Sequence, residues 1–380
     1  MTWQHWPAPA SAVTRFSGFG LGSASRARVR FDAEEARNQP KWVAKLPEVP
    51  FSPADLPSYS PFSAPDFAVA LSAWFETSQR EMPWRRAENC ADPYRVLVSE
   101  MMLQQTTVAA VVPFFERFIA RFPTVSDLAR APESEVLSHW AGLGYYSRAR
   151  NLQRAAKQVM EQHGGQFPTD FAAILALPGV GRYTAGAVAS IALLQRQPIV
   201  DANVARVLSR VLCVEGDLKT ASNQAKLWDG ATQIVAVDAV SPREINPALM
   251  ELGALVCTPK NPKCDRCPVV KWCLARAQNR QNELPFIAPK AALTLLFDVC
   301  AFAQNERGQV LLRRRPHDAK WWQNMWELPR TTRIEGESAA QALQRLAEEL
   351  GFGIEVGREI SDLKHGVTRY AITLSCFEAQ

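Results

Sequence analysis

The chain has 380 residues, enough for two or three domains, and its 47% apolar and 21% charged content is ordinary for a soluble globular protein. A net charge of +5 and a pI near 8.8 are compatible with a polyanionic partner. No apolar run reaches the length that crosses a membrane, so a helical membrane protein is excluded.

The first segment shows no helical or strand periodicity. Residues 1–65 are rich in Pro, Ser and Ala, and no acidic residue precedes Asp32 although four arginines do. This composition predicts a disordered tail. An organellar targeting peptide has the same composition, and a disordered basic arm or an upstream start codon explains it equally well.

Helical periodicity begins with the apolar residues that recur from Phe67 to Phe75, which predicts a helix there. Met82–Arg86 ends this helix and places Trp84 beside Arg85. These two side chains could stack on and contact a base. The alternative is a core tryptophan with solvated arginines.

The next predicted helix carries a carboxylate among apolar residues. Asp92-Pro93 has the pattern of a helix start, with Asp as N-cap and Pro at the first helical position. Leu97 and Met101 give the helix a buried side, and Glu100 lies among them. Burial should raise the pKa of this carboxyl and suit a proton donor near neutral pH. A helix whose Glu finds a satisfied partner is the structural alternative.

Two turns between predicted helices carry groups suited to nucleic acid. In the first, Gln104, Gln105 and Thr106 offer two amides and a hydroxyl, which can read base edges and phosphates. In the second, which contains two glycines, Tyr145 and Arg148 fit insertion into nucleic acid or stacking on it. Two buried tyrosines are the alternative for the second turn.

A more specific motif follows, Leu177-Pro-Gly-Val-Gly-Arg-Tyr-Thr-Ala-Gly186. A short apolar helix, 171–175, is predicted to run into the turn, and a second helix to open directly after it. Gly179 and Gly181 let backbone N–H groups approach an anion, which predicts a helix-hairpin-helix that grips a DNA phosphate without reading sequence. A generic Gly-rich helical turn is the alternative. Tyr183, just after the turn, is expected to face the site.

Asp201 follows a short apolar segment, with Asn203 two residues further on. Asp201 could simply be the N-cap of a helix over 204–212. A carboxylate placed after a helix-hairpin-helix could also be the second acid of a base-excision enzyme. Cleavage of a glycosidic bond requires one protonated and one ionised carboxylate, and Glu100 would supply the other.

The most specific pattern is formed by four of the eight cysteines: Cys257, Cys264, Cys267 and Cys273. Their spacing suits a [4Fe–4S] cluster, and zinc is the competitor because it also accepts four cysteines. Such clustering argues against a disulfide framework and therefore favours a reducing cytoplasm. Lys260 and Lys263 lie in the first loop, where they could meet phosphates.

These motifs together resemble the endonuclease III superfamily of DNA glycosylases. Three stretches resemble MutY-type adenine DNA glycosylases in particular: Ser99-Glu-Met-Met-Leu-Gln-Gln-Thr106, Gly142-Leu-Gly-Tyr-Tyr-Ser-Arg-Ala-Arg150 and the hairpin motif. The resemblance covers the chain from about residue 66 to its end. That family removes adenine mispaired with 8-oxoguanine or guanine in double-stranded DNA.

The resemblance implies roles for the matching residues. Glu100 would protonate adenine N7, and Asp201 would stabilise the oxocarbenium ion and, in the family's retaining scheme, bond transiently to the sugar. Tyr183 and Asn203 would support Asp201. Other matching residues would lie around the flipped base or the base opposite it: Gln105, Tyr145, Leu103 and Thr106. Lyases of this superfamily carry a Lys where Tyr183 stands, so the resemblance implies a glycosylase without lyase activity.

One position departs from the family. Pro247 stands where relatives carry a Glu or Gln that contacts adenine. Proline has no side-chain hydrogen-bonding group, so adenine must be read partly by other residues.

From about residue 291 the pattern predicts an α+β domain, with strands over 293–302, 309–312 and 367–377 and a helix over 337–350. It resembles the Nudix-like domain with which MutY-type enzymes sense 8-oxoguanine. Arg345 stands where the Nudix metal site needs a carboxylate, which predicts that nucleotide hydrolysis is lost. Thr368 and Arg369 match the loop that contacts 8-oxoguanine; an ordinary strand edge is the alternative. The chain stops soon after a strand, so this domain could be incomplete.

We therefore predict a multidomain α and α+β chain: a tail over 1–65, an all-α helix-hairpin-helix glycosylase domain over 66–290 with a cluster loop over 257–273, and a Nudix-like domain over 291–380. The predicted function is adenine excision by a monomer in the bacterial cytoplasm, associated with the nucleoid. The alternatives are a thymine-mismatch glycosylase or pyrimidine-lesion lyase of the same superfamily, a non-catalytic cluster-bearing DNA-binding protein, and a Nudix hydrolase with a DNA-binding extension.

Overall fold

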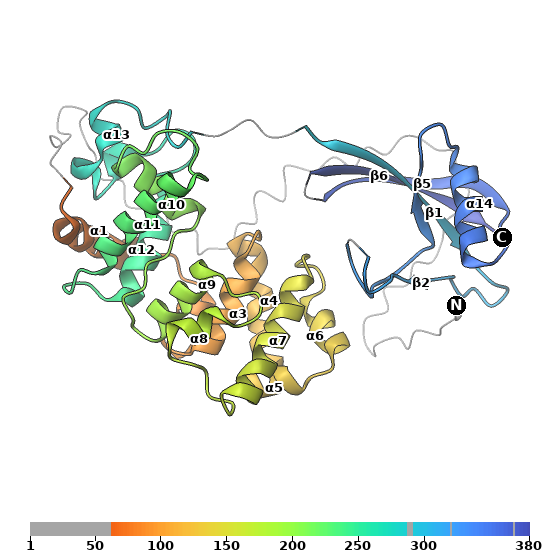
Figure 1. Ribbon diagram of the computed structural model, residues 1–380, viewed down its shortest axis with the longest axis horizontal. Coiled ribbons are helices and arrows are strands. Elements are labelled where there is room, and N and C mark those ends of the chain that lie inside the picture. The colour runs from red at the N-terminus through yellow and green to blue at the C-terminus, as the bar shows by residue number, and fades with distance from the viewer. Residues whose placement is uncertain (1–61, 287–291, 320, 368) are drawn as a thin grey trace. The chain divides into compact units, whose positions relative to one another are not determined.

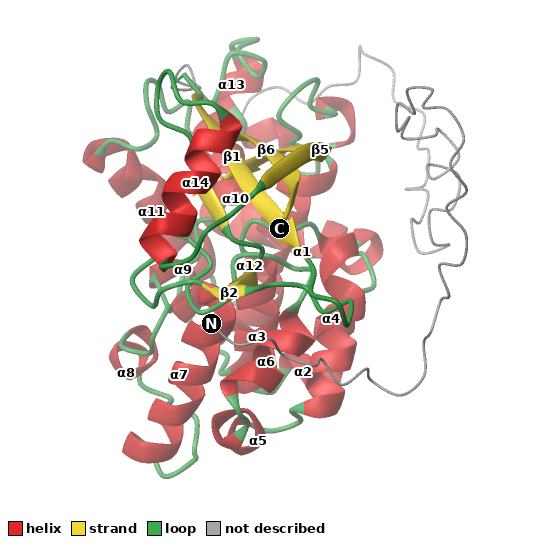
Figure 2. Ribbon diagram, turned by 90° about the vertical axis from the view of Figure 1, so that its right-hand side faces the viewer, coloured by secondary structure: helices red, strands yellow, loops and turns green. Residues whose placement is uncertain are grey.

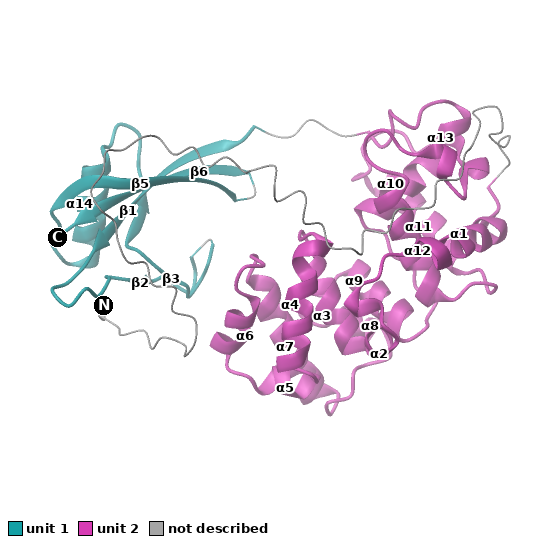
Figure 3. Cartoon of the chain, turned by 180° about the vertical axis from the view of Figure 1, so that it is seen from behind, with its two compact units in different colours: residues 1–29, 289–380 teal, residues 30–288 magenta. Residues whose placement is uncertain are grey.

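The computed structural model of the protein describes residues 62–286, 292–319, 321–367 and 369–380. These residues fall into two compact units, 62–286 and the part from 292 onward (Figure 3). The predicted tail lies outside the described residues except at 62–65.

The first unit is helical throughout its regular elements, as predicted (Figure 1). Its longer helices are α1 (Ala64–Ser78), α3 (Pro93–Leu103), α4 (Val108–Arg121), α6 (Glu133–Trp140), α7 (Ser147–Gln162), α10 (Ala202–Val211), α11 (Ala221–Val235) and α12 (Pro242–Leu255). Its short elements are η3 (Pro83–Arg85), α2 (Ala87–Cys90), α5 (Val125–Arg130), α8 (Phe171–Leu175), α9 (Arg182–Ala187), η4 (Val188–Ala192), η5 (Cys264–Arg266), η6 (Val270–Trp272) and α13 (Leu274–Ala277). None of the described helices combines the length and the apolar character needed to cross a bilayer.

Two hydrophobic cores hold the helical unit together. One is built mainly from α3 to α9 and η4 and includes the buried Phe115 and Trp140. The other is built from α1, α10, α11 and α12 and includes the buried Phe67 and Leu208. Burial of such side chains is the main stabilising term in folding. Because α3 and α10 belong to different cores, residues on these two helices are brought together only when both cores form.

Local sequence accounts for where the important helices start. Asp92 caps α3 by accepting a hydrogen bond from the Tyr94 backbone N–H at 2.9 Å, with Pro93 at the first helical position, as predicted. Asp201 caps α10 by accepting one from the Val204 N–H at 2.7 Å.

The second unit contains a four-stranded sheet with the order β4-β1-β6-β5. Strands are yellow in Figure 2. Its strands are β1 (Thr294–Ala303), β4 (Arg330–Thr332), β5 (Val356–Val367) and β6 (Tyr370–Ala379), and β2 (Arg313–Arg314) pairs with β3 (Trp326–Glu327) in a separate ribbon. Strands β1 and β6 are parallel, and the other pairs are antiparallel. Helix α14 (Ala339–Leu350) packs Leu343 and Leu346 against Val299 and Ala301 of the sheet.

The α+β class was predicted correctly, but the strands were only partly right. Residues 309–312 lie outside the regular strands, and Val310 makes only an isolated bridge to Gln304. The predicted strand over 367–377 includes the last residue of β5 and most of β6. Strand β5 itself was missed because most of its residues are exposed at the sheet edge, where charged side chains replace an apolar alternation.

Candidate active site

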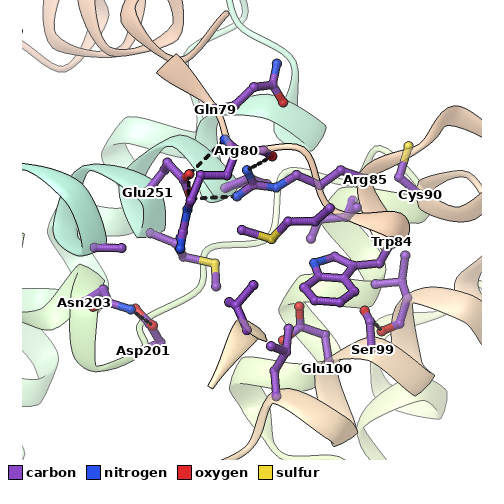
Figure 4. A pocket seen from close by; sticks show the side chains of 18 of the residues that line it. Gln79, Arg80, Trp84, Arg85, Cys90, Ser99, Glu100, Asp201, Asn203 and Glu251 are labelled. Atoms are coloured by element: carbon purple, nitrogen blue, oxygen red, sulfur yellow. Dashed lines mark hydrogen bonds and ion pairs between the residues drawn. The ribbon is translucent and has the colours of Figure 1, made fainter. Parts of the chain in front are cut away.

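A cavity of about 540 Å³ opens in the helical unit, and both predicted catalytic carboxylates line it (Figure 4). Its walls come from the end of α1 and the segment after it, from α3 and the turn at 104–106, from the starts of α9 and α10, and from α12. This volume is typical of a site for a small molecule or an extruded base.

Glu100 lies on α3 and is buried, with only 5% of its surface exposed. Its Oε2 atom has no hydrogen-bond partner among the described residues. The pKa of Glu100 is raised from its ordinary value of 4.5 to about 7. Burial is the main cause, the charge of Asp201 adds to the rise, and the phenol of Tyr183 opposes it. The expectation of a raised pKa is therefore confirmed, and the carboxyl can hold a proton near neutral pH.

Asp201 faces the same cavity from the start of α10 (Figure 4). Its Oδ1 accepts the Val204 N–H, and its Oδ2 accepts a hydrogen bond from Asn203 Nδ2 at 2.9 Å. Burial raises the pKa of Asp201, and these bonds oppose that rise. The N-cap interpretation and the catalytic interpretation are thus compatible, because capping the helix fixes the carboxylate in the cavity wall.

Arg206, one turn further along α10, was not singled out from the sequence. Its guanidinium donates to Asn203 Oδ1 and to the backbone carbonyl of Cys257, each at 2.7 Å. It therefore ties the residue that supports Asp201 to the start of the cysteine loop.

Tyr183 lies in the first turn of α9 and lines the cavity. Burial raises the pKa of its phenol, and the neighbouring charge of Glu100 adds to the rise, so the group is a neutral hydroxyl. Its Oη atom lies 3.9 Å from Met250 Sδ. The structure brings Tyr183, Glu100, Asp201 and Asn203 to one cavity, as the resemblance implied.

Trp84 and Arg85 both line the cavity, but each is held by contacts within the protein. Trp84 is 8% exposed and packs edge to face on Phe115, with ring centroids 5.7 Å apart, so it is a core residue at the cavity wall. Arg85 donates to Glu251 Oε2 at 2.9 Å and to the Arg80 carbonyl at 3.0 Å, so it is a half-buried member of an ion pair and not a solvated arginine.

Glu251 on α12 is a buried acid that binds Arg80 and Arg85, and it was not identified from the sequence. It accepts hydrogen bonds from Arg80 Nε at 2.7 Å and from Arg85, and only 1% of its side chain is exposed. Burial raises the pKa of Glu251, but the two guanidiniums outweigh it and leave the pKa below its ordinary value. A carboxylate within an apolar helix was the available signal, the same one that identified Glu100. Pro247 also lines the cavity, on the same helix.

The two polar turns are present, but one predicted DNA contact is wrong. Gln105 and Tyr145 are exposed, and both have a left-handed backbone, with φ of 57° and 48°. Leu103, Gln104 and Thr106 are half-buried at the cavity rim. Arg148, by contrast, is buried with 6% exposure and donates to backbone carbonyls, so it is not placed to contact DNA.

The hairpin forms as predicted, with α8 and α9 on either side of the turn. Gly179 has φ of +76°, and a Cβ there would lie 2.6 Å from Asn151 Cβ, so both backbone and packing require glycine. Gly181 is the residue before α9 and meets no such neighbour.

The four cysteines of the loop line one small cavity together with apolar side chains such as Leu252 and Val256. Burial and mutual repulsion raise the pKa of three of these thiols, Cys264, Cys267 and Cys273, so a cationic group is needed to hold them as thiolates. No three Cys, His, Asp or Glu side chains in the described part of the chain converge on a single metal ion. Four thiolates around one cavity are the donor set of an iron–sulfur cluster, which takes one thiolate on each iron.

In the second unit, Thr368 lies outside the described residues. Arg369 is exposed and donates to Tyr370 Oη at 3.2 Å. Arg345 of α14 binds Glu337 at 2.9 Å and Glu349 at 3.3 Å. A cation therefore occupies the helix face that a Nudix metal site would need for carboxylates.

Three family models match the chain: the HhH-GPD superfamily of base excision DNA repair proteins over residues 98–231, the iron–sulfur binding domain of endonuclease III over 257–273, and the NUDIX domain over 299–380. The adenine DNA glycosylase of Homo sapiens is 44% identical over 260 residues, which cover 66% of this chain and 47% of that protein. The adenine DNA glycosylase of Buchnera aphidicola subsp. Schizaphis graminum is 37% identical over 220 residues, 58% of this chain and 62% of that protein.

The chain thus spans about half the length of the mammalian relatives it matches. Among solved structures, a thermostable thymine-DNA glycosylase is similar with a TM-score of 0.50 and 31% identity, covering 56% of this chain and 95% of that one. The iron–sulfur match coincides with the four cysteines that line one cavity. The chain therefore carries an HhH-GPD domain of base excision DNA repair proteins over residues 98–231, an iron–sulfur binding domain of endonuclease III and a NUDIX domain, and is a homologue of the adenine DNA glycosylases.

Proposed function

We propose that this protein is a monofunctional adenine DNA glycosylase that removes adenine mispaired with 8-oxoguanine or guanine in double-stranded DNA. The observation that carries the proposal is the pairing of buried Glu100 and capped Asp201 in one cavity, in a chain homologous to adenine DNA glycosylases. The cavity is reached by a base only after it leaves the duplex.

Glu100 is proposed as the general acid. Adenine is a poor leaving group as an anion, and a proton on N7 allows it to depart neutral. With a pKa of about 7, Glu100 is substantially protonated at neutral pH and can deliver that proton. When the C1′–N9 bond breaks, its electron pair leaves with the base, and the sugar becomes an oxocarbenium ion.

Asp201 is proposed as the group that stabilises this cation. Its two oxygens are oriented by the Val204 N–H and the Asn203 amide, so the charge needs no reorganisation when the sugar cation forms. In the retaining scheme implied by the resemblance, one oxygen bonds to C1′, and water later replaces it to leave an abasic site. Tyr183 carries a phenol and not an amine, so no Schiff base forms at this position and the strand is not cut.

The cysteine loop is proposed to bind a [4Fe–4S] cluster through Cys257, Cys264, Cys267 and Cys273. When bound, the cluster supplies a rigid anchor for the loop, and no electron transfer is needed for hydrolysis. Lys260 and Lys263 are both exposed, which leaves them available for phosphates of the duplex.

The NUDIX domain is proposed to read 8-oxoguanine opposite the target adenine and not to hydrolyse nucleotides. The ion pairs of Arg345 with Glu337 and Glu349 support the loss of a metal site. Thr368 and Arg369 remain proposed contacts to the lesion. With all its proposed catalytic groups in one cavity of one chain, the enzyme is proposed to act as a monomer on the bacterial nucleoid in the cytoplasm.

The test is base removal from defined duplexes by wild type and Glu100→Gln. Purified protein is mixed in excess with duplexes that carry adenine opposite 8-oxoguanine, adenine opposite guanine, or thymine opposite guanine, and alkali-labile sites are counted over time. We expect excision of adenine by wild type and a loss on the order of 10²-fold or more in Glu100→Gln. Fluorescence anisotropy should show unchanged binding of the duplex by the variant.

A matched control is Glu161→Gln, which removes an exposed carboxylate from α7 and should retain the wild-type rate. Equal rates for wild type and Glu100→Gln would show that Glu100 is not the acid. Excision of thymine in place of adenine would favour the thymine-mismatch alternative. Binding without excision of either base would favour the non-catalytic alternative.

A further inference from the structure

Arg148 is a buried cation without a carboxylate partner among the described residues. It lies in the first turn of α7 with 6% of its surface exposed, and no ion pair includes it. A buried charge is unfavourable unless dipoles or hydrogen bonds compensate it. What compensates Arg148 therefore indicates what the residue holds in place.

One side of the guanidinium binds the end of α3. Its Nη1 donates to the carbonyls of Met101 at 3.0 Å and Met102 at 2.8 Å, and also to that of Gln104. These are carbonyls that a helix leaves unpaired at its C-terminus, where the helix dipole also favours a cation. Arg148 thus acts as the C-terminal cap of the helix that carries Glu100.

The other side of the guanidinium binds both polar turns at once. Its Nη2 donates to Thr106 Oγ1 at 3.2 Å in the first turn, and to the carbonyls of Leu143 at 3.2 Å and Gly144 at 3.1 Å in the second. One planar group therefore sets the spacing of two turns that are about forty residues apart in the chain.

Each turn presents one exposed side chain from an unfavourable backbone conformation. Gln105 and Tyr145 both have positive φ, which costs a residue other than glycine about 1 kcal/mol or more and persists only where neighbours enforce it. The Arg148 guanidinium also lies 5.4 Å from the Tyr145 ring. Arg148 bonds to the residues on either side of Gln105 and to the two residues before Tyr145, and Trp140 Nε1 adds a bond to the Gly144 carbonyl at 3.1 Å.

We propose that Arg148 is a positioning residue that holds Gln105 and Tyr145 as one preorganised pair for the extruded base and its surroundings, without touching DNA itself. The proposal rests on the proposed function for what the pair contacts, but the coupling of the two turns is a property of the free protein. Preorganisation of this kind lowers the cost of reaching a reactive geometry.

The test uses Arg148→Lys in the full-length protein. Lysine keeps the charge but cannot direct two nitrogens to both turns. Amide hydrogen exchange of the free variant should become faster at both turns, 104–106 and 143–145, while the rest of α3 and α7 stays protected. Excision at saturating duplex should slow by on the order of 10²-fold, as expected when reacting groups are misplaced by about 1 Å.

The salt dependence of duplex binding separates positioning from a direct phosphate contact. A positioning residue leaves the slope of log binding constant against log salt unchanged in Arg148→Met, whereas loss of a phosphate contact reduces it by about 1. Arg150→Lys is the control, because Arg150 lies on the same helix and pairs with Glu133 at 3.0 Å. It should match wild type in exchange and in rate.

Faster exchange in only one turn, a wild-type excision rate in Arg148→Lys, or a reduced salt slope would overturn the proposal. If Arg148→Lys does not fold, Thr106→Val provides the test, because it removes one acceptor of Nη2 in the first turn only. It must then speed exchange in the second turn, and unchanged exchange there would equally refute the coupling. If exchange becomes faster at both turns in Arg148→Lys but the wild-type protein removes no base, the coupling of the turns stands and only the proposed function is refuted.

Discussion

The stability of Glu100→Gln relative to wild type should increase as pH rises. Only the wild type carries a buried carboxyl at this position, and its ionisation is unfavourable in the folded state. The pKa of Glu100 is raised from 4.5 to about 7 by burial. Between these two values the folded protein binds more protons at Glu100 than the unfolded chain does, so wild-type stability falls as pH rises through this window. Glutamine has no proton to lose, and its contribution is independent of pH.

The size of the effect follows from the pKa shift. One pKa unit corresponds to about 1.4 kcal/mol, so the full penalty at high pH is about 3 kcal/mol, and roughly 2.5 kcal/mol of it develops between pH 5 and pH 8. The unpartnered Oε2 position means that the glutamine amide is also left unsatisfied, at a cost of about 1–3 kcal/mol. That cost is the same at each pH, so the pH dependence of the difference isolates the charge.

The assay is thermal unfolding of both proteins, followed by circular dichroism of the helical signal from about pH 5 to about pH 8 at constant ionic strength. The difference in melting temperature, variant minus wild type, should rise by roughly 5–10 °C over this range for a unit of this size. Glu161→Gln, which removes an exposed carboxylate, is the control. A difference that stays constant within about 1 °C across the range would refute a strongly raised pKa, and with it the assignment of Glu100 as an acid at neutral pH.

Four further predictions follow from the site. Tyr183→Phe removes the phenol that lowers the pKa of Glu100, so the high-pH limb of the single-turnover rate should move to higher pH; an unmoved or lowered limb would contradict this contact. Borohydride should not trap a protein–DNA adduct, because the hairpin offers no amine at Tyr183; efficient trapping would show lyase chemistry. Purified protein should be brown and contain iron, and colourless protein with stoichiometric zinc would refute the cluster. Deleting residues 291–380 should reduce the preference for 8-oxoguanine over guanine opposite adenine while slow adenine removal persists, and an unchanged preference would sink the proposed role of that domain.

Much of the active site could be predicted from the sequence because it depends on interactions between near neighbours in the chain. The N-caps Asp92 and Asp201 bond to amides two or three residues away, and the helix boundaries of the hairpin follow from its glycines. The burial of Glu100 follows from the apolar residues around it on α3. The four cysteines lie within seventeen residues, so their shared cavity needs little more than a local loop.

Strand β5 shows where this reasoning stops. An edge strand hydrogen-bonds to one neighbour and exposes its side chains, so its sequence carries little of the apolar alternation that reveals an inner strand. Its partner β6 was recognised in part because it lies inside the sheet and is more buried.

Which acceptor each arginine binds was decided only by the tertiary structure. Arg85 and Arg148 were both predicted to contact DNA, since a guanidinium beside an aromatic residue or a turn has that chemistry. Arg85 instead meets Glu251, which is 166 residues away in the chain, and Arg148 meets the end of α3, more than forty residues away. A guanidinium binds a carboxylate, a helix C-terminus or a phosphate through the same donors, so the residue type alone cannot select among them. Which acceptor lies within reach is fixed when the two hydrophobic cores bring α3, α7 and α12 together.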